Sequence, residues 1–86
     1  MSDLQGAFEK AVGEAKSLPN RPDTETLLKL YALYKQGTSG DASGDRPDAF
    51  DFVASAKYKA WESVAGTPGE TAMQRYIDLV EKMKAP

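Results

Sequence analysis

The feature that most constrains the fold is a helical spacing of apolar residues that returns in four segments. In each segment, apolar residues recur three and four positions apart, which places them on one face of an α-helix. The segments cover about residues 3–17, 24–36, 51–65 and 68–83. An amphipathic helix has to bury its apolar face against another element of structure. The sequence therefore predicts an all-α protein built as a four-helix bundle.

Glycine and proline mark where these helices are expected to begin and end. Gly37 is predicted to stop the second helix and Gly66 the third, because glycine readily adopts the backbone conformation that follows a helix. Thr67, Pro68 and Glu70 then match a capping box. The Thr67 side chain is therefore predicted to accept a hydrogen bond from the first turn of the fourth helix.

The lengths of the three connections predict the directions of the helices. The first and third connections are short, so the first helix is expected as an antiparallel neighbour of the second, and the third of the fourth. The middle connection, about residues 37–50, is long and carries three glycines and Pro47. At about 3.3 Å per extended residue it can run the length of a helix of about 15 residues, near 22 Å. The second and third helices can therefore run parallel.

The composition excludes several kinds of chemistry. At 86 residues, the chain is expected to form a single domain over residues 1–86. It has no cysteine and no histidine, which removes disulfides, thiolate and imidazole metal ligands, and the usual base that activates a serine. The acidic loop at 41–45 lacks the spacing and the final glutamate of a calcium-binding loop. We therefore expect no metal ion, no cofactor, no catalytic residues and no enzymatic activity.

Charge and hydropathy limit the partners of the chain. No apolar run approaches the roughly 18 residues that span a bilayer, and no leader-like segment opens the sequence. The protein is expected to be soluble and cytoplasmic, without stable membrane insertion. The net charge of −2 argues against general nucleic-acid binding, which depends on an excess of basic residues. Any site for an anion should therefore be local.

The end of the second segment is a candidate for such a site. Tyr31, Tyr34 and Lys35 are three and four residues apart, so they share one helical face just before the glycine-rich connection. Two rings that can stack and one ammonium group that can meet an anion suit a nucleotide phosphate ester. The alternative is that both tyrosines are core rings with their hydroxyls in water, the usual role of tyrosine on an apolar stripe.

Lys57 interrupts the apolar stripe of the third segment. A lysine in this position either extends its head to water or meets a negative charge. Lys16 flanks the stripe of the first segment one turn after Val12, and Tyr76 lies among apolar residues of the fourth, where a core ring is the more common role. If the helices converge, these lysines and tyrosines would surround one concavity suited to a phosphate, an aromatic base and an apolar tail.

The order and spacing of these residues resemble the acyl-CoA-binding protein family. The resemblance covers nearly the whole chain and includes Phe8, the run Tyr31-x-x-Tyr34-Lys35-Gln36-x-Thr38-x-Gly40-Asp41, Arg46-Pro47, Lys57, Trp61 and Tyr76. It implies a four-helix bundle with up-down-down-up topology, in which a long crossover joins two parallel helices. It also implies a monomeric carrier that binds medium-to-long-chain fatty acyl-CoA and transports or buffers it without catalysis.

The resemblance further implies roles for individual residues. Four residues fall where the family surrounds the phosphates of CoA: Lys16, Tyr31, Lys35 and Lys57. Tyr34 would pack on the adenine, and Tyr76 would complete the nucleotide side. A set of apolar residues would line the path of the acyl chain: Phe8, Val12, Leu27, Leu28 and Leu30.

The chain departs from the family pattern in the third segment. Tyr58 stands where many members carry a second tryptophan, and Val53 and Ser55 replace lysines that are common there. Fewer basic residues predict weaker long-range attraction of an anionic ligand.

The residues also leave two other functions open. A small helical module could bind a partner helix or peptide through the face of Tyr31 and Tyr34. A thioester hydrolase has only scattered serines and carboxylates in its favour. For a carrier, contacts with enzymes that use acyl-CoA are expected to be transient.

Overall fold

The computed structural model describes residues 3–19 and 21–85 of the chain. It contains four helices: α1 (Asp3–Lys16), α2 (Thr24–Ser39), α3 (Phe52–Glu62) and α4 (Gly69–Lys84). None of the described residues lies in a β-strand. The prediction of an all-α fold with four helices is confirmed, and a long crossover, residues 40–51, joins α2 to α3.

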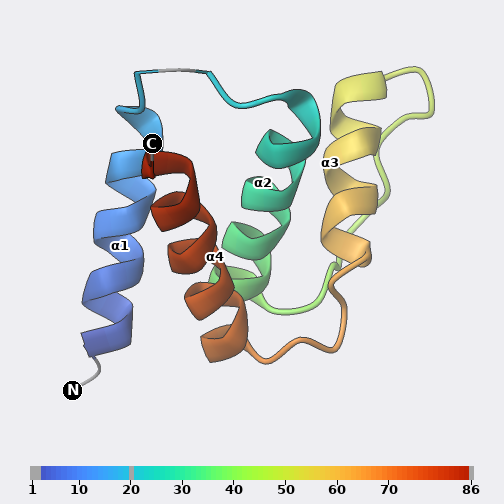
Figure 1. The fold of residues 1–86 in the computed structure, drawn as a ribbon. Coiled ribbons are helices and arrows are strands. Elements are labelled where there is room, and N and C mark those ends of the chain that lie inside the picture. Colours follow the sequence, from blue (N-terminus) through green and yellow to red (C-terminus); the bar gives the residue numbers. More distant parts are fainter. Residues whose placement is uncertain (1–2, 20, 86) are drawn as a thin grey trace.

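The helices follow the up-down-down-up topology. Figure 1 shows that α1 and α4 run in one direction and that α2 and α3 run in the other. After α2, the crossover returns along the outer side of α3 to the opposite end of the molecule, so that α3 begins beside the start of α2 (Figure 1). The parallel arrangement of α2 and α3 that the length of this connection allows is therefore present.

The expectation that helices joined by short connections are neighbours is wrong. The pairs that pack together are α1 with α4, α4 with α2, and α2 with α3, and Figure 1 shows the order α1, α4, α2, α3 across the molecule. Six residues separate α3 from α4, and seven separate α1 from α2. At about 3.3 Å per residue, such segments reach roughly 20 Å, twice the usual distance between packed helices. A short connection can therefore pass over the end of one intervening helix.

The hydrophobic core lies between α1, α2 and α4. Its buried members include Phe8 on α1, Leu30 on α2, and Tyr76 and Val80 on α4. Among the described residues, α3 contributes no buried side chain to this cluster and has one buried residue of its own, Trp61. The third helix is thus attached to the outer side of α2, and the seam between these two helices lies outside the main core.

The second helix ends later than the sequence predicted. It continues through Gly37 to Ser39 and ends at Gly40, whose φ is 80°. Gly37 has another role, because a Cβ built on it would lie 3.1 Å from Cγ of Met73 on α4. The glycine allows α2 and α4 to approach closely, and the left-handed backbone that stops the helix comes three residues later.

The boundary between α3 and α4 also differs from the prediction. Helix α3 ends at Glu62 rather than near residue 65, and a turn follows in which Gly66 has a φ of 86°. The capping box is wrong: Pro68 occupies the N-cap of α4, and no side chain caps it. The carbonyl of Thr67 instead accepts a hydrogen bond of 2.8 Å from Nε2 of Gln36. This residue is used to join two parts of the chain rather than to start a helix.

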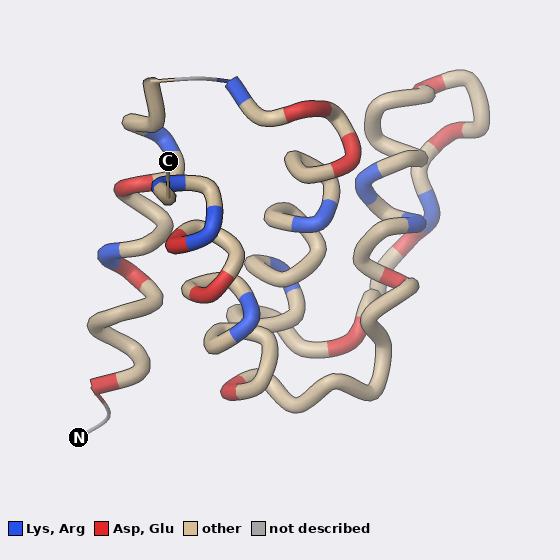
Figure 2. Tube along the Cα trace, in the orientation of Figure 1, with Lys and Arg blue, Asp and Glu red and all other residues tan. Residues whose placement is uncertain are grey.

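The arrangement of the four helices gives a flat molecule, with extents of 36 × 32 × 16 Å. Positive and negative residues are spread over all four helices rather than gathered on one of them (Figure 2). None of the helices in the described part of the chain is long and apolar enough to cross a membrane.

Candidate functional site: the groove between α2 and α3

A groove follows the seam between α2 and α3 and consists of two adjoining cavities that share Tyr31 and Lys57. The first cavity has a volume of about 620 Å³ and is otherwise lined by Arg21, Thr24, Leu27, Leu28, Phe52, Val53 and Ala56. The second has a volume of about 290 Å³ and is otherwise lined by Lys35, Ser43, Gly44, Asp45, Pro47, Ala54, Tyr58 and Trp61. We call the two cavities together the front groove, the first being its apolar end and the second its polar end.

Tyr31 and Lys57 meet where the two ends of the front groove join. Tyr31 is on α2 and Lys57 is on α3, and Nζ of Lys57 lies 5.4 Å from the centroid of the Tyr31 ring. An exposed lysine over an aromatic ring gains about 0.5–1 kcal/mol from the attraction between the cation and the ring. The lysine that interrupts the apolar stripe of α3 therefore crosses the seam and places its charge in the groove.

The polar end holds a second lysine over a second ring. Nζ of Lys35 lies 4.8 Å from the centroid of the buried Trp61 ring. The indole Nε1 of Trp61 donates a hydrogen bond of 2.7 Å to the carbonyl of Gly40, which fixes the ring against the start of the crossover. Among the described residues, neither Lys35 nor Lys57 forms a salt bridge. Two cations without carboxylate partners therefore share one cavity with aromatic rings.

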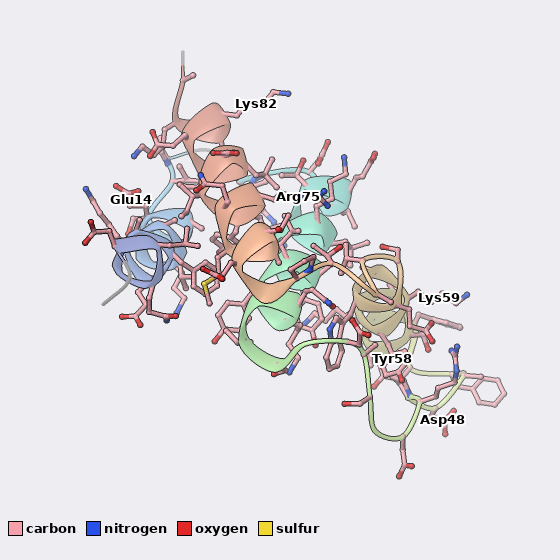
Figure 3. All side chains as sticks on the ribbon, turned by 90° about the horizontal axis from the view of Figure 1, so that it is seen from below. Glu14, Asp48, Tyr58, Lys59, Arg75 and Lys82 are labelled. Atoms are coloured by element: carbon pink, nitrogen blue, oxygen red, sulfur yellow. The ribbon has the colours of Figure 1, made fainter. Side chains whose placement is uncertain are left out.

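The crossover closes the polar end from outside. The guanidinium of Arg46 lies 5.3 Å from the ring centroid of Tyr58 and forms a salt bridge of 2.6 Å with Glu62. Figure 3 shows Tyr58 on the side of α3 that faces the crossover, which carries Asp48, whereas Lys59 points away from the molecule. Tyr58, which stands where many family members carry a second tryptophan, is therefore part of the wall of the polar end.

Four residues anchor the start of the crossover, and we call them the crossover latch: Gln36, Asp41, Gly66 and Thr67. The side chain of Gln36 is buried, and its Nε2 donates to Oδ1 of Asp41 at 2.7 Å and to the carbonyl of Thr67 at 2.8 Å. The backbone N–H of Gly66 donates to the same Asp41 oxygen at 2.8 Å. The hydrogen bonds from Gln36 and Gly66 hold the pKa of the Asp41 carboxyl below its usual value.

Sequence reasoning missed the latch, although its residues lie in the run that drew attention to the site. Gln36, Gly40 and Asp41 follow Tyr31 and Lys35 in the run that resembles the acyl-CoA-binding protein family, and the sequence alone predicts no structural role for them. In the structure, their hydrogen bonds go to the end of α3 and to the turn before α4. On α2, Gln36 lies between the half-buried Lys35 and Gly37, and its own burial follows only from the packing of the helices. No local pattern in the sequence could have identified the latch.

The other two predicted tyrosines lie in a separate aromatic cluster. The Phe8 ring stacks on Tyr34 with centroids 6.0 Å apart and meets Tyr76 edge to face at 5.3 Å. Tyr76 is 5% exposed, and its burial raises the pKa of its hydroxyl. Tyr34 is 40% exposed and presents part of its ring at the surface. This cluster joins α1, α2 and α4, and neither tyrosine lines the front groove.

The predicted apolar residues also divide into two groups. Leu27 and Leu28 line the apolar end of the front groove. Leu30 is buried in the core, and Val12 packs against that core. Lys16 is exposed in the last turn of α1 and lines neither cavity of the groove. The structure thus brings Tyr31, Lys35 and Lys57 together with the two leucines, and it places the remaining predicted residues elsewhere.

Two of the groove residues outside the predicted set are large, exposed and apolar. Phe52 and Val53 line the apolar end and are 77% and 68% exposed. They precede Ala56 and Lys57 by four residues each, so they share a helical face with them. That spacing was the signal in the sequence that could have identified both.

These features define a class: a small all-α protein with an elongated groove that is apolar at one end and cationic and aromatic at the other. Residues 5–80 match the family model described as "Acyl CoA binding protein". The chain is 42% identical over 79 residues to acyl-CoA-binding protein homolog 1 of Caenorhabditis elegans, covering 92% of each chain. The chain belongs to the acyl-CoA-binding protein family.

Solved structures agree with this assignment. The crystal structure of Oryza sativa acyl-CoA-binding protein 2 superposes with a TM-score of 0.89 at 40% identity, covering 93% of this chain and 87% of that chain. The solution structure of the acyl coenzyme A binding protein from yeast gives a TM-score of 0.72, also at 40% identity, covering 96% of this chain and 93% of that chain. At these identities the likeness extends to the sequence as well as to the fold.

One further group of relatives is much longer than this chain. Enoyl-CoA delta isomerase 2 of Rattus norvegicus is 44% identical over 85 residues, which are 99% of this chain and 22% of that protein. The human protein of the same name is 42% identical over 96% of this chain and 21% of its own length. The chain thus spans about a fifth of these relatives.

Proposed function

We propose that this chain binds medium-to-long-chain fatty acyl-CoA esters in the front groove and carries or buffers them without catalysis. One observation supports the proposal above all: an apolar end and a cationic, aromatic end form one groove that is joined at Tyr31 and Lys57. An acyl-CoA ester has the same two parts, an apolar chain and a nucleotide with phosphates. Membership of the family supports the same ligand class.

In this proposal the polar end holds the phosphates of CoA. Lys35 and Lys57 stand over Trp61 and Tyr31 and have no carboxylate partner in the part of the chain that the structure describes, so their N–H donors are available to an anion. Hydrogen bonds between charged groups are worth about 1.5–3 kcal/mol each. The acyl chain would lie along the apolar end, where Leu27 and Leu28 of α2 face the first turns of α3.

The remaining predicted residues are proposed to act at the edge of the site or from behind it. Tyr34 would offer its exposed ring to the adenine, and Lys16 would reach the phosphates from the end of α1. The buried Phe8 and Tyr76 would support Tyr34, since both rings are in its cluster. Val12 and Leu30 would contribute indirectly, by packing in or against the core that supports these helices.

The carrier is proposed to act as a single domain, residues 1–86, as a cytoplasmic monomer that meets enzymes using acyl-CoA only briefly. The absence of histidine and cysteine from the sequence supports a role in binding rather than in thioester cleavage. The thioester would be carried and released intact.

Titration calorimetry with CoA and with a series of saturated acyl-CoA esters tests the proposal. Each methylene buried in the apolar end should contribute about 0.8 kcal/mol, so affinity should rise with chain length until the groove is filled, and free CoA should bind far more weakly. Equal affinities for CoA and palmitoyl-CoA would contradict the proposed role of the apolar end. Formation of free CoA during long incubation with the ester would contradict the non-catalytic role.

A further inference from the structure

The seam between α2 and α3 opens into a second apolar cavity. This cavity, which we call the rear cavity, has a volume of about 370 Å³, and Ala32, Ala60 and Val64 contribute to its lining. Its two charged residues, Glu25 and Lys29, form an exposed ion pair with 3.7 Å between the charged atoms. Because these charges face each other, the cavity suits an uncharged chain rather than a phosphate.

Leu28 is the side chain that the two cavities have in common. Among the described residues, no other lines both the apolar end of the front groove and the rear cavity. On α2, Leu27 belongs to the front lining and Ala32 to the rear lining, so Leu28 stands where these two helical faces meet.

On the α3 side of the seam, the residues that share cavity walls with Leu28 include two small alanines. Ala56 lines the front groove, and Ala60, one turn later, lines the rear cavity. Each of these residues shares a cavity wall with Leu28 and extends no further than one methyl group. The half-buried Leu28 is therefore the bulkiest of these three side chains, and of the three it alone lines both spaces.

Resting on the proposed function, we infer that Leu28 is the partition that sets the acyl-chain length this protein accepts. The acyl tail lies alongside Leu27 and Val53 in the front groove, and Leu28 bars it from crossing the seam. The rear cavity is a reserve of apolar space that a tail enters only when the side chain at this position is smaller. Leu28 thus determines specificity for chain length.

Calorimetry on matched leucine variants tests the partition. In the native protein, Kd should fall about fourfold per added methylene, the gain from burying one CH₂, and then level off. In Leu28→Ala the levelling-off should move to longer chains. Leu27→Ala removes the same atoms from the front lining alone, so it should weaken binding and leave the length limit where it was. Leu28→Phe opens no cavity and keeps the partition closed, so it should not move the limit to longer chains.

Methyl NMR of the same proteins reports where the tail lies. Val53 lines the front groove and Val64 the rear cavity, so each is a reporter for one space. A long acyl-CoA should shift the Val53 methyl signals in every protein and the Val64 signals in Leu28→Ala.

The outcomes separate the inference from the function on which it rests. An unmoved Val64 signal together with an unchanged length limit in Leu28→Ala would overturn the partition and leave the carrier function intact. A limit that moved to longer chains in Leu28→Phe would overturn it equally. No heat of binding and no shift of Val53 in the native protein would instead contradict the proposed function itself.

Discussion

Lys57 lies on the face of α3 that packs against α2, where an apolar residue would be expected. Val53 precedes it and Trp61 follows it by one turn, yet its ammonium group lies over the Tyr31 ring, where the front groove is open to solvent. The exposed head avoids the cost of burying a charge, and the ring attracts the cation without using its N–H donors. The lysine thus extends its head to water, which is one of the two alternatives that the sequence allowed. That the head also meets an anion stays a prediction.

Replacing this lysine tests the electrostatic part of the proposal. Lys57→Ala should weaken binding of palmitoyl-CoA roughly 10- to 100-fold, the equivalent of one or two hydrogen bonds between charged groups. Lys59→Ala removes the same charge from a side chain that points away from the molecule (Figure 3) and should change Kd less than about twofold, as screened surface charges do. Similar losses in the two variants, measured by calorimetry, would mean that general charge rather than the groove holds the ligand.

The sequence predicts which residues share one face of a helix, but it does not predict which faces of different helices come together. Tyr31 and Lys35 are four residues apart on one helix, so their common face follows from local geometry alone. Lys57 was identified because a charge in an apolar stripe needs an explanation. Tyr34 and Tyr76 depend on which helix packs against which face, and this is decided by the position of α4 between α1 and α2. Spacing within one helix carries no information about that order.

The helix ends show how packing between elements can override local signals. Gly37 resembles a helix stop in the sequence, yet α2 continues through it because the glycine lies against Met73 and Phe8. Thr67 resembles an N-cap, yet it serves the crossover latch through its carbonyl. Both differences arise from contacts between residues that are far apart along the chain, and no local pattern contains them.

Glycine-to-alanine substitutions distinguish the two kinds of helical glycine. Gly13 in α1 has open space around it, so Gly13→Ala should raise the free energy of unfolding by about 0.5–1 kcal/mol through helix propensity. Gly37→Ala should give no such gain, because its Cβ would lie 3.1 Å from Met73 Cγ and 3.6 Å from Phe8 Cζ. Urea unfolding measures both, and an equal gain at the two positions would show that α2 and α4 are not closely packed there.

The crossover latch is expected to support the fold at the level of elements. Gln36→Ala removes two hydrogen bonds from a buried side chain and should lower the free energy of unfolding by about 2–3 kcal/mol. Gln74→Ala is the matched control, because Gln74 also donates to an aspartate, Asp78, but does so on the exposed face of α4. Equal losses in the free energy of unfolding of the two variants, measured by urea denaturation, would show that the latch contributes no more than a surface pair.

The pKa of Asp41 predicts how the latch depends on pH. Hydrogen bonds from Gln36 and Gly66 lower the pKa of this carboxyl in the folded state, so its contribution is complete above the usual aspartate pKa of about 4 and is lost as pH falls through the lower folded value. Asp41→Asn keeps an acceptor oxygen without the charge. The stability difference between the native protein and this variant should therefore be constant near neutral pH and shrink below about pH 4. A difference that stayed constant down to pH 3 would show that the charge of Asp41 adds nothing.

In the molecule as a whole, the front groove lies outside the hydrophobic core. The core joins α1, α2 and α4, whereas α3 packs on the far side of α2 and is tied to the rest through Trp61 and the crossover latch. This division lets the seam between α2 and α3 stay open without exposing the core. It also brings one end of that seam to the crossover, whose residues help to line the polar end.

One groove is proposed to hold both parts of one ligand, and isotope-filtered NMR of the palmitoyl-CoA complex locates each part separately. Nuclear Overhauser effects are expected from acyl protons to the methyl groups of Leu27 and Val53, and from nucleotide protons to the ring of Tyr31 in the polar end or to the exposed ring of Tyr34. Acyl contacts confined to surfaces outside the α2–α3 seam, or nucleotide and acyl contacts on unconnected faces, would contradict it.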